Sequence, residues 1–137
     1  MTISVSQQQG RVPVTVINIE GRLDGQNYQD LINKGRELYS AGTRDVLLDL
    51  TNLSYISSAG MVAFHNIALL LRGETPPNPE QGWSAYRSMG RGAIEGGLEE
   101  HFKLFNPQPE VNRILDMVGF NTIFEIFTDM DQAIKSF

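Results

Sequence analysis

Apolar and polar residues alternate at the start of the chain, a pattern typical of strands with one face in a core. The alternation covers residues 3–8, stops at the turn-forming residues 10–13 and is followed by the β-branched run 14–19. Apolar residues then recur at helical spacing over residues 26–40, and Gly42 just beyond them is a suitable C-terminal stop. The pattern predicts two strands joined by a short turn, followed by an amphipathic helix.

The middle of the chain is its most apolar part. Residues 46–50 form a short apolar run, which is typical of a strand covered on both faces, and we expect the central strand here. Residues 58–71 are apolar nearly all round and predict a buried helix. Ser58 is a good N-cap candidate for this helix, because its hydroxyl can accept a hydrogen bond from an amide of the first turn.

Glycine and proline are concentrated in residues 73–97, so this stretch predicts a long loop. Alternating strands and helices predict an α/β fold, and the length is suited to a single domain over residues 1–137. The elements expected after the loop are a strand over 101–105, a helix over 109–118, a strand over 124–127 and a terminal helix over 129–137.

Composition narrows the classes of function. The 137 residues include 11 Lys and Arg against 16 Asp and Glu, and this net charge of −5 argues against a nucleic-acid partner. The absence of cysteine excludes disulfides, thiolate nucleophiles and Cys-ligated zinc. The chain start does not resemble a signal peptide, and no apolar run approaches the roughly 18 residues of a membrane span. We therefore expect a soluble, cytoplasmic protein without direct membrane insertion.

Two serines, Ser57 and Ser58, lie at the predicted junction of a strand and a helix, but they do not form the G-x-S-x-G motif of serine hydrolases. His65 lies seven residues beyond Ser58, which is roughly 10 Å along a helix and too far for direct proton transfer. A hydrolase would need the long loop to close over the serines and bring His101 close to them.

Other chemistry finds little support. The residues show no metal-ligand spacing and no phosphate-binding loop, and we expect no metal and no cofactor. A receiver domain has this size, but it needs several acidic residues at strand ends, where only Asp49 lies.

The start of the helix at Ser57 and Ser58 favours an added anion, because amides point outward there and the helix dipole is positive. A phosphoryl group would add a charge of about −1.5 to −2 and three strong acceptors. Position alone leaves two interpretations of Ser58 open: a simple N-cap or a phosphorylation switch.

Three segments carry a resemblance to a known family. Residues 48–61, LDLTNLSYISSAGM, resemble the signature of STAS domains, the family of bacterial anti-sigma factor antagonists. Residues 21–24, GRLD, resemble the family's G-x-L-D turn, and residues 109–120 resemble its late helix, closed by a glycine and an apolar residue. The three segments occur in the order that the family has.

The resemblance implies a STAS-like α/β domain, a mixed sheet of four to five strands flanked by helices. Residues 73–100 depart from the family pattern, which usually has a much shorter turn there, and we expect them to form a flexible loop insert. It also implies a phosphorylated switch serine at the start of the second helix; alignment on Gly60 places it at Ser58, with Ser57 as second choice. Ser57 stands where the family pattern has aspartate. The partner-binding residues expected on this basis are Asp24, Ser57, Ser58, Ala59, Gly60 and Met61.

The function that the resemblance implies is a non-catalytic anti-sigma factor antagonist in a partner-switching pathway. Its partners would be an anti-sigma factor that is also a serine kinase, and a phosphatase. The alternative is a constitutive STAS interaction subunit of an ABC lipid-transport or sensory complex, in which Ser58 is only a cap and contact residue. Aromatic and arginine residues of the insert are either partner contacts or part of a loop without function: Trp83, Tyr86, Arg87 and Arg91.

Overall fold

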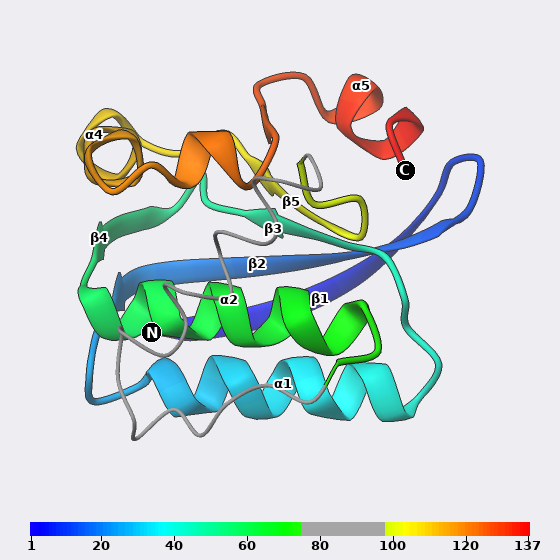
Figure 1. Ribbon diagram of the computed structural model, residues 1–137, viewed down its shortest axis with the longest axis horizontal. Coiled ribbons are helices and arrows are strands. Elements are labelled where there is room, and N and C mark those ends of the chain that lie inside the picture. Colours follow the sequence, from blue (N-terminus) through cyan, green and yellow to red (C-terminus); the bar gives the residue numbers. More distant parts are fainter. Residues whose placement is uncertain (75–97) are drawn as a thin grey trace.

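The computed structural model describes residues 1–74 and 98–137, and Figure 1 shows their arrangement. Most of the insert expected over residues 73–100, including its aromatic and arginine residues, lies outside the described residues. In chain order the elements are β1 (Thr2–Gln9), β2 (Pro13–Leu23), α1 (Tyr28–Ser40), β3 (Val46–Asp49), β4 (Leu53–Ile56), α2 (Ser58–Leu71), β5 (Phe102–Phe105), α4 (Pro109–Met117), a 3-10 turn (Phe120–Thr122), β6 (Ile126–Phe127) and α5 (Met130–Lys135).

The sheet is mixed, as predicted, and its strand order is β1-β2-β3-β5-β6. Among the strands of residues 1–74 and 98–137, only the β1–β2 pair is antiparallel; the other pairs are parallel. The long strand β2 pairs first with β3 and then, beyond a register shift between Gly21 and Arg22, with β4. The described sheet therefore has six strands rather than the expected four to five, because the pattern of residues 51–56 did not predict β4. The expectation that residues 46–50 hold the central strand is confirmed by the position of β3.

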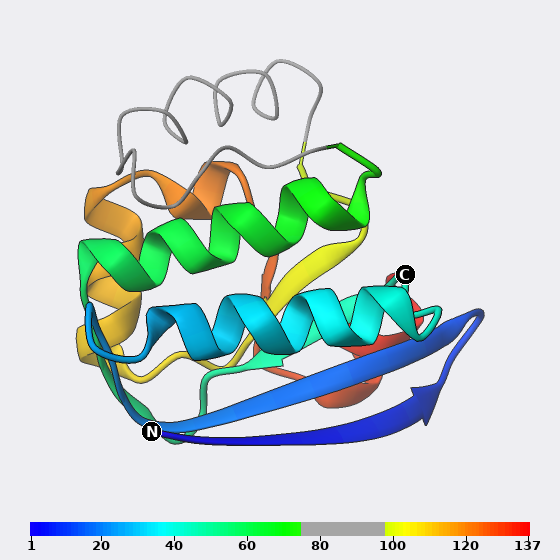
Figure 2. The same ribbon diagram turned by 90° about the horizontal axis from the view of Figure 1, so that it is seen from below.

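The central strands β3 and β5 are buried on both faces, which explains their apolar runs. Figure 2 shows α1 and α2 side by side over one face, and α5 lies against the other. Neighbouring residues of β3 alternate accordingly: Leu48 belongs to the core with α1, α2 and α4, whereas Leu47 packs with Ile134 of α5. Helix α2 is buried along almost its whole length, as predicted.

The later elements follow the predicted order with changed bounds. Helix α4 begins at Pro109 and is followed by Gly119, whose positive φ of 80° ends the helical path. The strand expected over 124–127 is reduced to β6, because the Phe124 amide donates to the Phe120 carbonyl (2.8 Å) at the start of the 3-10 turn instead of pairing in the sheet. Among the helices of the described residues, none combines the length and the apolar character needed to cross a membrane.

Candidate functional site at the start of helix α2

The junction between β4 and α2 is held by the backbone and side chain of Ser57. The Ser57 amide donates to the Leu23 carbonyl at the end of β2 (2.9 Å), and the Ser57 hydroxyl accepts from the Gly60 amide (3.5 Å). Ser57 is therefore the N-cap of α2. The expectation that Ser58 is the cap is wrong by one residue, because the bond to Leu23 keeps Ser57 in the extended conformation that an N-cap requires.

Ser58 is the first residue of the 14-residue helix α2 and is exposed, whereas Ser57 is half-buried. The amides of a first helical turn point outward and have few partners within the helix, and the positive end of the helix dipole lies there. An anionic group attached to the Ser58 hydroxyl would thus meet a favourable electrostatic environment. Because Ser58 is exposed, a phosphoryl group on its hydroxyl would extend into solvent.

The turn after β2 brings Asp24 beside this junction, since Leu23 accepts the hydrogen bond from Ser57. The Asp24 carboxylate accepts from the Gln26 amide (3.0 Å), and the Asp24 amide donates to the side-chain oxygen of Asn27 (2.9 Å). The Asn27 amide group in turn donates to the Arg22 carbonyl (2.8 Å). Asn27 thus fixes the turn that presents Asp24, a role that sequence reasoning missed because it depends on a local turn geometry.

Two of the expected contact residues point into the protein. A Cβ atom at Gly60 would lie 2.8 Å from Cγ1 of Ile56 and 2.9 Å from Cγ of Leu23, so glycine is required for the close approach of α2 to β2 and β4. Met61 is 6% exposed and belongs to the main core. The surface formed at this site therefore comes from Asp24, Ser57, Ser58 and Ala59, which we call the α2-start surface.

The two histidines of the chain lie away from this surface. His101 contacts Asp45 (Nδ1 to Oδ1, 2.8 Å) at the amino ends of β5 and β3, whereas Ser58 follows the carboxyl end of the parallel strand β4. His65 is 4% exposed and packs against the rings of Phe120 and Phe124, with centroids 4.9 and 5.6 Å away. Because neither histidine is placed to act as a base for Ser58, the geometry overturns the Ser–His hydrolase alternative.

Asp49 is a structural residue of the turn between β3 and β4. Its carboxylate accepts from the amide (3.0 Å) and the hydroxyl (2.6 Å) of Thr51, and from the side-chain amide of Asn18 (3.1 Å). In the described ranges 1–74 and 98–137, no three His, Cys, Asp or Glu side chains gather in a way that could hold a metal ion. Among the described residues, Asp49 therefore lies outside any acidic cluster of the kind that a receiver domain needs.

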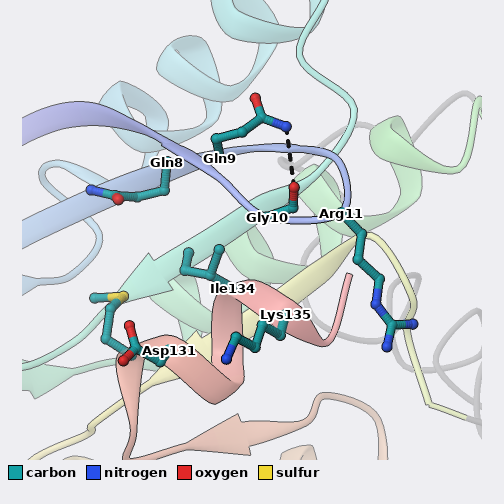
Figure 3. Close-up of a pocket in the computed structure, with 8 residues that line it drawn as sticks. Gln8, Gln9, Gly10, Arg11, Asp131, Ile134 and Lys135 are labelled. Carbon is teal, nitrogen blue, oxygen red and sulfur yellow. Dashed lines mark hydrogen bonds between the residues drawn. The ribbon is translucent and has the colours of Figure 1, made fainter.

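Two open hollows lie at the far end of the sheet, near the amino ends of the parallel strands. One, of about 420 Å³, lies between the β1–β2 hairpin and α5; Figure 3 shows Arg11 and Lys135 at it together with Asp131. The other, of about 600 Å³, lies between the same hairpin and the chain that leads from α1 into β3. Neither includes a residue of the α2-start surface.

The capping arrangement gives a first testable result. We expect Ser57→Ala to lower the free energy of unfolding by about 1 kcal/mol, because the Gly60 amide loses its side-chain acceptor. Ser58→Ala should change it by less than about 0.5 kcal/mol, since that side chain is exposed. Urea denaturation of both variants checks the assignment. Equal losses, or the larger loss at Ser58, would contradict it.

Comparison with known proteins places this geometry in a family. The STAS domain model matches residues 4–74, more than half of the chain, and the match includes Asp24 and the whole of α2. The search of curated proteins finds no match.

Solved structures share the fold at low sequence identity. An anti-sigma factor antagonist from Mycobacterium paratuberculosis is 16% identical with a TM-score of 0.65, and the match covers 98% of this chain and 92% of that one. The anti-sigma factor antagonist SpoIIAA in its unphosphorylated form is 15% identical with a TM-score of 0.57, covering 96% and 93%. The Bacillus cell fate determinant SpoIIAA in the phosphorylated form is 13% identical with a TM-score of 0.54, covering 97% and 96%. The chain belongs to the STAS domain family.

Proposed function

We propose that this STAS domain is a non-catalytic anti-sigma factor antagonist that acts in cytoplasmic signal transduction and transcription regulation. Its α2-start surface binds an anti-sigma factor that is also a serine kinase, and phosphorylation of Ser58 ends the contact until a phosphatase removes the group. The observation that carries the proposal is the exposed Ser58 at the first turn of α2. The names of the structural neighbours support the same role.

Ser58 is a better acceptor than Ser57. The Ser57 hydroxyl caps the helix and its residue is half-buried, so esterification there would compete with the hydrogen bond from Gly60. Serine and aspartate are both favoured N-caps, so Ser57 in place of the family aspartate keeps the helix start intact. The change removes one carboxylate charge beside Ser58 and leaves the acceptor position itself unchanged.

Phosphorylation would weaken the contact through charge and hydration. A phosphoryl group adds about −1.5 to −2 charges to a chain that already carries −5, on the surface to which Asp24 also contributes. A partner surface that fits the neutral hydroxyl would have to remove water from the phosphoryl group without offering a cationic side chain to pair with it. The phosphorylated domain therefore leaves the partner.

A kinase and binding assay tests the proposal. With an anti-sigma factor serine kinase from the same genome and ATP, the protein should gain one phosphate on Ser58, and the Ser58→Ala variant should gain none. In titration calorimetry, Ser58→Asp should weaken partner binding by about tenfold or more, while Ser58→Ala stays close to the unmodified protein.

Ser40→Asp is the matched control for the added charge. Ser40 is exposed at the C-terminal end of α1, on the way to the amino end of β3 and so at the far end of the sheet from Ser58. The Ser40→Asp variant should bind the partner with the affinity of the unmodified protein. The absence of both a phosphate on Ser58 and a complex with the kinase would refute the proposal.

One observation favours a second function. Because Ser57 removes the charge that the family pattern places before the acceptor, a constitutive STAS interaction subunit of an ABC lipid-transport or sensory complex would need Ser58 only as a contact. The same Ser58→Asp variant separates the two functions. A binding loss no greater than that of Ser58→Ala would favour the constitutive subunit.

A further inference from the structure

Strand β1 forms an open edge of the sheet. It is the first strand in the sheet order and pairs only with β2, over eight consecutive residue pairs from Thr2–Glu20 to Gln9–Pro13. Seven of its eight residues are exposed. In Figure 2 no other element of the described chain lies beyond β1. Its outward backbone amides and carbonyls therefore have no strand partner among the described residues.

The edge also lacks the features that normally prevent strand pairing. Protective edges are short, charged, bulged or interrupted by proline. The sequence of β1, TISVSQQQ, contains no charged residue and no proline, and its pairing with β2 has no register shift. The opposite edge strand, β6, has only two residues and thus offers little to pair with. The difference identifies β1 as the edge that can accept another strand.

We propose that β1 pairs antiparallel with β1 of a second copy of this chain, about a two-fold axis that passes between the two Val5 residues. In that register the sheets of the two copies become continuous, Val5 lies opposite Val5, and Ser4 lies opposite Ser6. The pairing covers the Val5 side chain, which is 39% exposed in one copy. Every pair formed among the β1 residues in this way is uncharged, and each pair away from Val5 occurs twice, once on either side of the axis, as an isologous contact requires.

The absence of charge on β1 favours a second copy over a different partner. The chain carries a net charge of −5, so two copies repel each other over most surfaces, but the β1 edge brings no like charges together. A strand from a charged partner would find no complementary residue on β1 to select it. Two copies of β1 can pair without charge repulsion, because both strands are uncharged.

The proposed dimer is independent of the proposed phosphorylation. β2 pairs with β1 along one edge and with β3 and β4 along the other, and α2 begins directly after β4. Ser58 therefore lies on the far side of β2 from the dimer contact. Ser58→Asp should dimerise like the unmodified protein, so failure of one proposal is distinguishable from failure of the other.

Analytical ultracentrifugation of the full chain over a concentration series tests the dimer. We expect the unmodified protein to reach twice the monomer mass, and we expect Val5→Lys and Val5→Glu each to weaken self-association by about tenfold or more, because the axis places like charges face to face. An equimolar mixture of the two variants should regain the dimer, since lysine then faces glutamate.

Val118→Lys is the matched control, because Val118 is similarly exposed (41%) but lies at the end of α4. It should dimerise normally, and circular dichroism should show that the variants remain folded. A monomeric unmodified protein, including one whose β1 accepts a strand from another protein, would overturn the proposal. So would a Val5→Lys variant that dimerises as well as the unmodified chain.

Discussion

Arg72→Met is expected to lower the free energy of unfolding by about 3 kcal/mol at pH 7, because it leaves a buried carboxylate without its cation. Arg72 follows α2, and its guanidinium contacts Glu74 (2.8 Å) and Glu99 (3.2 Å). Glu74 is the last described residue before residues 75–97, and Glu99 is the second one after them. The Glu99 side chain is only 4% exposed, whereas that of Glu74 is 44% exposed. The loss should therefore come almost entirely from Glu99.

The pH dependence of this loss follows from Glu99. Burial raises the pKa of Glu99 above its ordinary value of 4.5, and the hydrogen bond and charge of Arg72 act against that rise. Without Arg72 the pKa of the folded state should rise further, so the folded protein would bind more protons than the unfolded one above pH 4.5. The deficit of the variant should thus be largest near pH 7 and shrink as the pH falls toward 4.5.

Urea denaturation at pH 7 and pH 5 measures both effects. Glu74→Gln is the control for the exposed partner and should cost less than about 1 kcal/mol. Because Arg72 also opposes protonation of His65, the double variant Arg72→Met/Glu99→Gln is needed to isolate the carboxylate. It should regain most of the lost stability at pH 7. No recovery there, or a loss equally large at both pH values, would show that the buried carboxylate is not the cause.

The contacts of Arg72 illustrate what the sequence pattern cannot predict. Glu99 is separated from Arg72 by the Gly- and Pro-rich segment, and nothing in the spacing of the two residues indicates that they meet. Strand β4 was missed for a related reason. Four residues are too few for a clear period, and β4 exists because the far end of β2, beyond a register shift, offers it a partner.

The elements that could be predicted are those whose burial extends over many residues. Strand β3 is covered on both faces, so it appears as an apolar run, and α2 is buried almost all round, so its apolar character continues for several turns. In both cases the local pattern and the tertiary environment agree. The short strand β6 shows the converse, because the Phe124 amide bonds back to the Phe120 carbonyl and the strand keeps only two residues.

The candidate site was located by the family resemblance, and its details required the structure. Two adjacent serines can each cap a helix, and only the hydrogen bond from the Ser57 amide to Leu23 decides between them. Likewise, the resemblance groups Gly60 and Met61 with the contact residues, although both are buried. A motif reports which residues recur together, and the packing shows that some of them support the surface from within.

Lowering the pH from 7 to 4 should reduce the free energy of unfolding by about 3 kcal/mol through the titration of His65 alone. Burial, and to a lesser extent the charge of Arg72, lower the pKa of His65 in the folded protein from 6.5 to about 4. The unfolded chain therefore binds a proton on His65 between these two pH values, and the folded chain does not. Since the unfolded state gains protons first, this contribution is present above pH 6.5 and is lost as the pH falls toward 4.

The His65→Leu variant isolates this contribution from those of other groups. Leucine cannot titrate, and the rings of Phe120 and Phe124 that pack against His65 offer it apolar contacts. The difference in unfolding free energy between the unmodified protein and the variant, measured by urea denaturation at several pH values, should fall by about 3 kcal/mol from pH 7 to pH 4. The opposite contribution of Glu99, whose raised pKa favours the folded state at low pH, is present in both proteins and largely cancels.

His101→Asn is the matched control, because His101 is the second histidine of the chain and its side chain is 42% exposed. This variant keeps His65 and should keep the decline between pH 6.5 and 4. A decline that persists in His65→Leu would assign the acid sensitivity to other groups. The result bears on the proposed switch as well, because His65 belongs to the same helix that presents Ser58. The loss of stability in acid lowers the fraction of protein in which α2 holds Ser58 at the surface.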